Sequence, residues 1–227
     1  MEKSEGNARD IGAVARRIIG EGARPRTQGE ERRQALVEAA YALIAEAGFE
    51  QLRTRDVAAR VGVNIATLHY YFTTKEDLIQ GVVEYLLRQF MTAYLPGSAI
   101  EMRTPLEQIQ GEIAETQLLL RKKANTFVVL NELALRSLHD PAIRAHLAWL
   151  EAGWRAYLEQ VLRQGKEQGM FRADLDARGG ATWLILLIKG ATLHYMTDPE
   201  AINFTQIQAE IERWLTGQPV TAPEKDV

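Results

Sequence analysis

The segment from Thr54 to Phe72, TRDVAARVGVNIATLHYYF, constrains the fold of this chain more than any other stretch. We expect Thr54 to cap a short helix that carries Ala58 on its buried face. Gly62 permits a tight turn with positive φ, and Asn64 is a suitable cap for a second helix. Two short helices that cross at a glycine turn form a helix-turn-helix, a unit that can present its second helix to the DNA major groove.

Most other boundary signals in the sequence also mark the start or the end of a helix. Thr27 and Glu30 have the spacing of a capping box. Gly48 then ends a helix in the manner of a left-handed glycine cap. Three further starts pair a side-chain acceptor with a proline at the first helical position: Thr104-Pro105, Asp140-Pro141 and Asp198-Pro199. Because no alternating strand pattern accompanies them, the sequence predicts an all-α chain of roughly nine helices.

The composition excludes several classes of protein. The net charge of −3 means that nucleic-acid binding would need a local basic patch. The chain has no cysteine and four histidines, and it lacks a phosphate loop or a nucleophile-elbow motif. We therefore expect no enzyme activity, no metal site and no cofactor. Apolar runs such as Trp183–Ile188 are far too short to span a bilayer, so we expect a cytoplasmic protein that does not contact a membrane.

Residues 30–80 resemble the DNA-binding domain of the TetR/AcrR family of transcriptional regulators. The matching motifs are Ala47-Gly48-Phe49, Thr67-Leu68-His69-Tyr70-Tyr71-Phe72 and Lys75-Glu76-Asp77-Leu78. His69 stands where the family usually has tyrosine, and Tyr71 stands where histidine is frequent, so either could be the phosphate contact. The resemblance implies an N-terminal three-helix DNA-binding domain and a C-terminal helical bundle that binds a ligand and dimerises.

The helix-turn-helix and the start of the next helix supply the candidate DNA contacts. Arg55 and Lys75 each lie in the first turn of a predicted helix, where a cation opposes the helix dipole and a phosphate would compensate it. The alternative is that both are solvated surface charges. The predicted DNA-binding residues are Thr54, Arg55, Asn64, Ile65, Ala66, Thr67, His69, Tyr70, Tyr71 and Lys75.

Composition and the resemblance together divide the chain into four parts. We expect a mobile basic arm at 1–26, a helix-turn-helix domain at 27–74, a ligand-binding and dimerisation domain at 75–216, and a disordered tail at 217–227. The arm could enter the DNA minor groove or could be inert. Its arginines are Arg9, Arg16, Arg17, Arg24 and Arg26.

The predicted ligand-binding and dimerisation domain carries two candidate sites. Aromatic and polar residues could line an apolar cavity, with core packing as the alternative. These residues are Phe90, Gln117, Phe127, Asn131, Trp154 and Trp183. Small and apolar stripes on the last two helices could form a dimer interface, with packing inside one chain as the alternative. The stripes contain Gly180, Leu184, Leu187, Ala191, Ile207, Ile211 and Trp214.

From these features we expect a ligand-responsive transcriptional regulator. Specifically, the sequence predicts a repressor that binds a palindromic operator as a homodimer and is released by a small apolar or amphipathic effector. The alternative is a helical protein-interaction module without sequence-specific DNA binding.

Overall fold

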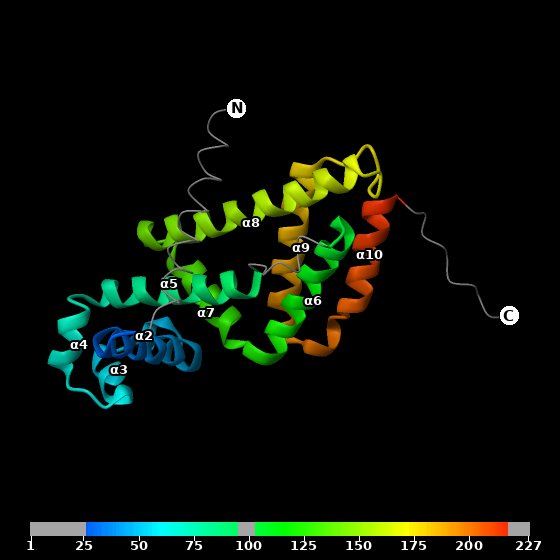
Figure 1. Cartoon of the computed structure of the whole chain (residues 1–227). Helices are drawn as coiled ribbons and strands as arrows, with labels where there is room; N and C mark the ends of the chain where they lie inside the picture. The colour runs from blue at the N-terminus through cyan, green and yellow to red at the C-terminus, as the bar shows by residue number, and fades with distance from the viewer. Residues whose placement is uncertain (1–25, 95–102, 218–227) are drawn as a thin grey trace. The chain divides into compact units, whose positions relative to one another are not determined.

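The computed structural model describes residues 26–94 and 103–217 of the chain. Nearly all of the predicted arm and tail therefore lies outside the described residues. Within the two described ranges the regular structure is helical, as the sequence predicts, and contains no strand (Figure 1). The elements in chain order are α2 (Gln28–Ala47), η1 (Phe49–Gln51), α3 (Thr54–Val61), α4 (Ile65–Tyr71), α5 (Lys75–Tyr94), α6 (Pro105–Lys123), α7 (Asn125–Arg136), α8 (Pro141–Glu167), α9 (Ala177–Thr197), η2 (Pro199–Ala201) and α10 (Phe204–Thr216).

The chain forms two compact units. The first unit comprises Met1–Leu95 with Lys123–Gly153, and the second comprises Pro96–Lys122 with Trp154–Val227. This division differs from the predicted boundary at residue 75, because α5 and α7 both pack against α2. The first unit therefore contains more than the three predicted DNA-binding helices.

The first unit is organised around α2. The predicted capping box is present at its start, where the Glu30 carboxylate accepts a hydrogen bond from Thr27 N at 2.8 Å and Glu30 N donates to Thr27 Oγ1 at 3.3 Å. Inside the unit, α5 approaches α2 closely at Gly81, since a Cβ there would lie 2.9 Å from Val37 Cγ2. A larger residue at Gly81 would push the two helices apart.

Two boundary predictions around α3 need correction. Thr54 does not cap α3 but is its first residue; Arg53 precedes the helix in extended conformation and makes no side-chain capping bond. Gly48 has the predicted positive φ of 81°, yet its ψ of 164° is not left-handed helical. The chain therefore leaves α2 in an extended direction and enters η1 directly.

The start of the last helix also needs correction. Asp198-Pro199 opens only the short turn η2, because the chain then becomes extended at Ile202. Asn203 caps α10 instead, accepting a hydrogen bond from Gln206 N at 3.1 Å. Asparagine is as good an N-cap as aspartate, so the sequence holds two valid starts and the later one begins the long helix.

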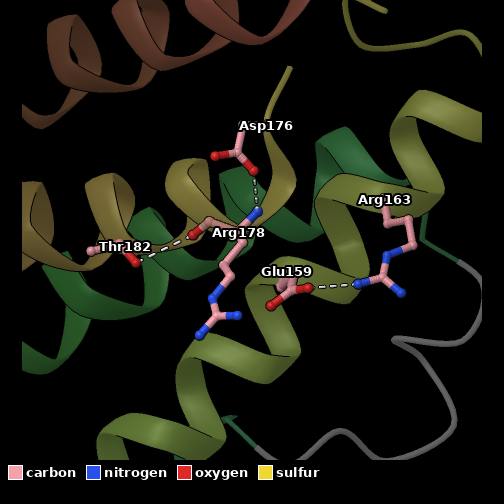
Figure 2. A network of polar contacts seen from close by, with 5 residues as sticks. All are labelled: Glu159, Arg163, Asp176, Arg178 and Thr182. Carbon is pink, nitrogen blue, oxygen red and sulfur yellow. Dashed lines mark hydrogen bonds and ion pairs between the residues drawn. The ribbon is translucent and has the colours of Figure 1, made fainter. Parts of the chain in front are cut away.

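The second unit contains a side-chain cap at the start of α9. Asp176 Oδ1 accepts a hydrogen bond from Arg178 N at 3.1 Å, and Thr182 Oγ1 donates to Arg178 O at 3.2 Å (Figure 2). On α8, Glu159 and Arg163 form an exposed ion pair at 2.6 Å. No helix in the described part of the chain is long and apolar enough to cross a membrane.

Candidate nucleic-acid interface

The turn between α3 and α4 has the geometry that the sequence predicts. Gly62 adopts the left-handed conformation, with φ 73° and ψ 32°. Gly62 N donates to Ala59 O and Val63 N donates to Ala58 O, both at 3.0 Å. This pair of bonds is a Schellman motif, and it satisfies the last carbonyls of α3. The two helices are thereby set at a fixed crossing.

The recognition helix α4 is capped at its start and anchored at its end. As predicted, Asn64 Oδ1 accepts hydrogen bonds from Thr67 N at 2.7 Å and from Thr67 Oγ1 at 2.9 Å. Leu68 is fully buried, and so is Phe72, which directly follows α4. Tyr70 on the opposite side is 83% exposed, which is unusual for so large a side chain. The packing therefore leaves one face of α4 open to a partner.

The two tyrosines of α4 have different surroundings. Their rings contact edge to face, with centroids 5.1 Å apart. Tyr71 is half-buried, and its hydroxyl lies 3.8 Å from the point where a Cβ on Gly29 would be. The Tyr71 hydroxyl therefore reaches the first turn of α2, whereas His69 is exposed to solvent. Both positions remain candidates for the phosphate contact.

Most of the remaining predicted DNA-binding residues are exposed to solvent. Ile65 and Ala66 are exposed on α4, and Thr54 is half-buried at the start of α3. The Arg55 side chain is 82% exposed and lies 3.6 Å from the Asp56 carboxylate. An ion pair this exposed contributes little and leaves Arg55 available to a phosphate.

Lys75 at the start of α5 is held beside an aromatic ring. Its Nζ lies 5.6 Å from the centroid of the Phe49 ring, within the range of a cation–π contact. Thr74 and Asp77 cap the same turn, with Thr74 N donating to the Asp77 carboxylate at 2.9 Å. The cation therefore lies beside the Phe49 ring in the first turn of α5, and its contact with a phosphate stays a prediction.

A salt bridge joins α3 to the end of α2. The Arg60 guanidinium donates two hydrogen bonds, both of 2.6 Å, to the two oxygens of Glu46. This bidentate contact holds the pKa of the Glu46 carboxyl below its ordinary value. The pair is exposed, so its main effect is to orient α3.

The sequence analysis missed a contact between α7 and the turn after α2. Phe49 N donates a hydrogen bond of 3.1 Å to Glu132 Oε2, and Arg136 lies 5.2 Å from the Phe49 ring centroid. We call Gly48 and Phe49 with these α7 contacts the Phe49 corner. Phe49 is only 4% exposed, so its N–H depends on Glu132 for a partner. Lys75 at the start of α5 and Arg136 on α7 therefore both lie next to the buried Phe49 ring.

Comparison with known proteins identifies the family. The model described as "Bacterial regulatory proteins, tetR family" matches residues 36–82, and the "BetI-type transcriptional repressor, C-terminal" model matches residues 113–219. The chain belongs to the TetR family. It is therefore a transcriptional regulator and not an enzyme.

Relatives and solved structures agree with this assignment. The HTH-type transcriptional repressor KstR2 of Mycobacterium tuberculosis is 28% identical over 149 residues, which cover 66% of this chain and 74% of KstR2. A transcriptional regulator from Saccharomonospora viridis in complex with choline has a TM-score of 0.70 at 24% identity, covering 82% of this chain and 96% of that one. FadR of Bacillus subtilis in complex with stearoyl-CoA has a TM-score of 0.67 at 22% identity, covering 81% and 97%. The likeness to the solved structures is one of fold.

The predicted ligand-binding residues of this TetR-family chain fall in both units. Phe127 and Asn131 belong to the first unit, where Phe127 is buried and Asn131 Nδ2 donates to Phe127 O at 2.8 Å. The Phe90 side chain lies outside the described residues. Gln117, Trp154 and Trp183 belong to the second unit. Of these, Trp154 contacts a buried acid.

That acid is Glu112 on α6, which the sequence analysis missed. Glu112 is 4% exposed, and Trp154 Nε1 donates a hydrogen bond of 3.0 Å to Glu112 Oε2. Burial raises the pKa of the Glu112 carboxyl to about 7, although the Trp154 hydrogen bond opposes the rise. Glu112 shares the buried face of α6 with Ile109 and Ile113, and this spacing was a signal that sequence analysis could have used.

The predicted dimer residues mostly pack inside the second unit. A Cβ at Gly180 would lie 2.9 Å from the Trp214 ring, so α9 and α10 are in close contact there. Four of the residues are buried in the single chain: Gly180, Leu184, Ala191 and Ile211. The other three are half-buried: Leu187, Ile207 and Trp214. The buried four have little surface left to offer a second copy.

Proposed function

We propose that this regulator is a repressor that binds a palindromic operator as a homodimer and releases it when a small effector binds. The observation that carries the proposal is the open face of α4, where Tyr70 is 83% exposed beside a capped and anchored helix. One such short helix reads few base pairs, and a two-fold dimer doubles that number. The same face gives no reason to favour a helix-turn-helix that binds protein instead of DNA.

An exposed apolar stripe on α9 supports dimerisation. Trp183 is 40% exposed, Leu186 64% and Leu193 52%. At helical spacing these three residues share one face with Gly190, where an added Cβ would meet no atom within 4 Å. Small residues between large exposed ones allow a second helix to approach closely, and a two-fold axis would pair the stripe with its own copy. We therefore assign the dimer surface to this stripe, with Leu187 and Trp214 at its border.

The relatives support a role for an effector. KstR2 carries the name of a repressor. The two solved neighbours named above hold stearoyl-CoA and choline, which are chemically unlike each other. We propose that this chain also binds an effector, through residues of the second unit that include Trp154. Because those two ligands differ, the chemical class of the effector is inferred from the residues of this chain and not from the neighbours.

The Phe49 corner supports a route by which helix movement reaches the DNA. A ligand can release the operator only if it prefers a conformation in which the two recognition helices are wrongly spaced. In the first unit, α7 holds the corner through Glu132 and contacts α2 again where Tyr41 Oη donates to Thr126 Oγ1 at 3.2 Å. A displacement of α7 would therefore move both Tyr41 and Phe49, and with them the segment that leads into α3.

Operator binding by the full-length protein tests the proposal. Fragments of the DNA that flanks its gene are titrated in a fluorescence anisotropy assay at several salt concentrations, and the bound fragment is footprinted. We expect a symmetric footprint whose half-sites lie about 34–36 Å apart, or a multiple of that distance. Binding that does not distinguish sequences, or a stoichiometry of one chain per site, would contradict the proposal.

A further inference from the structure

Glu112 is an acidic side chain in a buried and mostly apolar environment. It is 4% exposed and shares its helix face with Ile109, Ile113 and Thr116, which are all buried. A buried carboxylate is stable in its charged form only when a cation or several hydrogen-bond donors compensate it. Among the described residues, Trp154 is the only hydrogen-bond donor to Glu112. The Oε1 atom accepts no hydrogen bond from the described part of the chain.

A neighbouring negative charge makes the ionised form of Glu112 still less favourable in the absence of a cation. Glu115, one turn further along α6, is half-buried, and its negative charge acts on Glu112. Arg103 lies 3.8 Å from Glu115 Oε1 and forms its ion pair there. Within the described residues Glu112 has no ion pair of its own. Two acids and one cation therefore leave this part of the second unit with an excess of negative charge.

Aromatic side chains border the same two acids. Trp154 and Tyr157 lie one turn apart on α8, and both are half-buried, so each ring retains some contact with solvent. Burial, followed by the charges of Glu112 and Glu115, raises the pKa of the Tyr157 hydroxyl to about 12. The hydroxyl therefore stays neutral. We call Glu112, Glu115, Trp154 and Tyr157 the acid–aromatic cluster.

We propose that the acid–aromatic cluster binds the cationic head group of the effector, an organic ammonium ion. This inference rests on the proposed function, because it takes the second unit to be where the effector binds. The carboxylate of Glu112 supplies the charge, and the Trp154 indole lies beside it, because Trp154 Nε1 donates to Glu112 Oε2 at 3.0 Å. Tryptophan and tyrosine rings attract cations, above all weakly hydrated ones such as quaternary ammonium groups. An anionic head group would instead meet two negative charges.

Calorimetric titration with three small probes tests the proposal. The full-length protein is titrated at pH 8 with choline, with butylammonium, and with 3,3-dimethylbutan-1-ol, the uncharged carbon analogue of choline. We expect at least one cation to bind tenfold or more tightly than the alcohol. The two cations distinguish a quaternary head group, which the rings favour, from a primary one, which can donate hydrogen bonds to Glu112.

The Glu112→Gln variant isolates the charge. Glutamine has nearly the same shape and keeps an oxygen for the Trp154 N–H. We expect cation affinity to fall at least tenfold while the affinity for the alcohol stays unchanged. Glu200→Gln, at an exposed acid in the same unit, is the matched control and should bind as the wild type does. Tyr157→Leu gives a second variant, in which the affinity for the quaternary cation should fall several-fold.

Proton release adds a readout that a merely structural role of Glu112 would not produce. At pH 7 part of the Glu112 population is protonated, so binding of a cation should expel protons. Titrations in two buffers with different ionisation enthalpies measure this release, which should disappear in Glu112→Gln. Equal binding of choline and the alcohol, no binding of either cation, or unchanged cation affinity in Glu112→Gln would overturn the proposal.

The outcome separates this inference from the proposed function. If the wild type binds a symmetric operator and an uncharged or anionic compound releases it, the repressor role stands and the cation site fails. If the cations bind as expected but no operator is found, the repressor role fails and the cation site stands.

Discussion

The substitution Glu112→Gln should abolish one specific pH dependence of stability. The pKa of this carboxyl rises from the ordinary 4.5 to about 7 in the folded chain, chiefly because of burial. A raised pKa means that the folded state favours the protonated acid. The stability that it contributes is therefore fully present below about pH 4.5 and is lost as the pH rises through about 7. A shift of this size corresponds to roughly 3 kcal/mol in the free energy of unfolding.

Denaturation at several pH values measures this effect. Urea unfolding of wild type and Glu112→Gln is followed by circular dichroism at pH 5, 6, 7 and 8, at one protein concentration because the stability of any oligomer depends on it. The wild type should lose about 2.5 kcal/mol relative to the variant between pH 5 and pH 8, or about 5–10 °C in Tm for a chain of this size. Glu200→Gln should show no such trend. A free-energy difference between wild type and Glu112→Gln that is constant across this range would refute the reasoning.

Three further predictions concern the DNA interface, its support and the dimer. Lys75→Ala should weaken binding to all DNA sequences alike and reduce the slope of log K against log salt by about one, measured by anisotropy; an unchanged slope would refute the phosphate contact. Glu132→Ala leaves the buried N–H of Phe49 without its partner, so urea unfolding should show a loss of about 1–3 kcal/mol, and operator affinity should fall as well. Leu186→Asp should yield monomers in sedimentation experiments, whereas Leu118→Asp, at an exposed leucine of α6, should leave the dimer intact.

The sequence predicts the helix-turn-helix well because its signals are local. The turn depends on Gly62, which adopts φ 73° without strain because it has no Cβ, and on Asn64, whose side chain accepts a hydrogen bond from the backbone N–H three residues ahead. Both effects act within a few residues and need no knowledge of the rest of the chain. The start of α10 shows the limit of such signals. Two capping residues, Asp198 and Asn203, lie close together in the sequence, and local capping signals alone do not tell which of them begins the long helix.

Contacts between distant segments could not be predicted in this way. Glu132 lies far from Phe49 in the sequence, and a glutamate on a helix gives no sign that it will accept a hydrogen bond from a backbone N–H elsewhere. The two faces of α9 present a different difficulty. Leu184 and Leu186 are equally apolar, yet one is 1% exposed and the other 64%. On a helix that is apolar nearly all round, hydrophobicity alone does not tell the inner face from the outer one.

Glu112 differs from both cases. Burial among Ile109, Ile113 and Thr116 makes its ionised form unfavourable, so a ligand that compensates the charge would stabilise the folded protein. A cation that binds only the folded, ionised form stabilises the protein by RT ln(1 + [L]/Kd). If the acid–aromatic cluster binds ammonium ions, choline at a fixed concentration should therefore raise Tm more at pH 8 than at pH 5, where Glu112 is protonated. Differential scanning fluorimetry on wild type and Glu112→Gln measures both shifts. An equal shift at the two pH values, or the same shift in the variant, would mean that choline acts elsewhere on the protein and that the buried acid has no role in binding it.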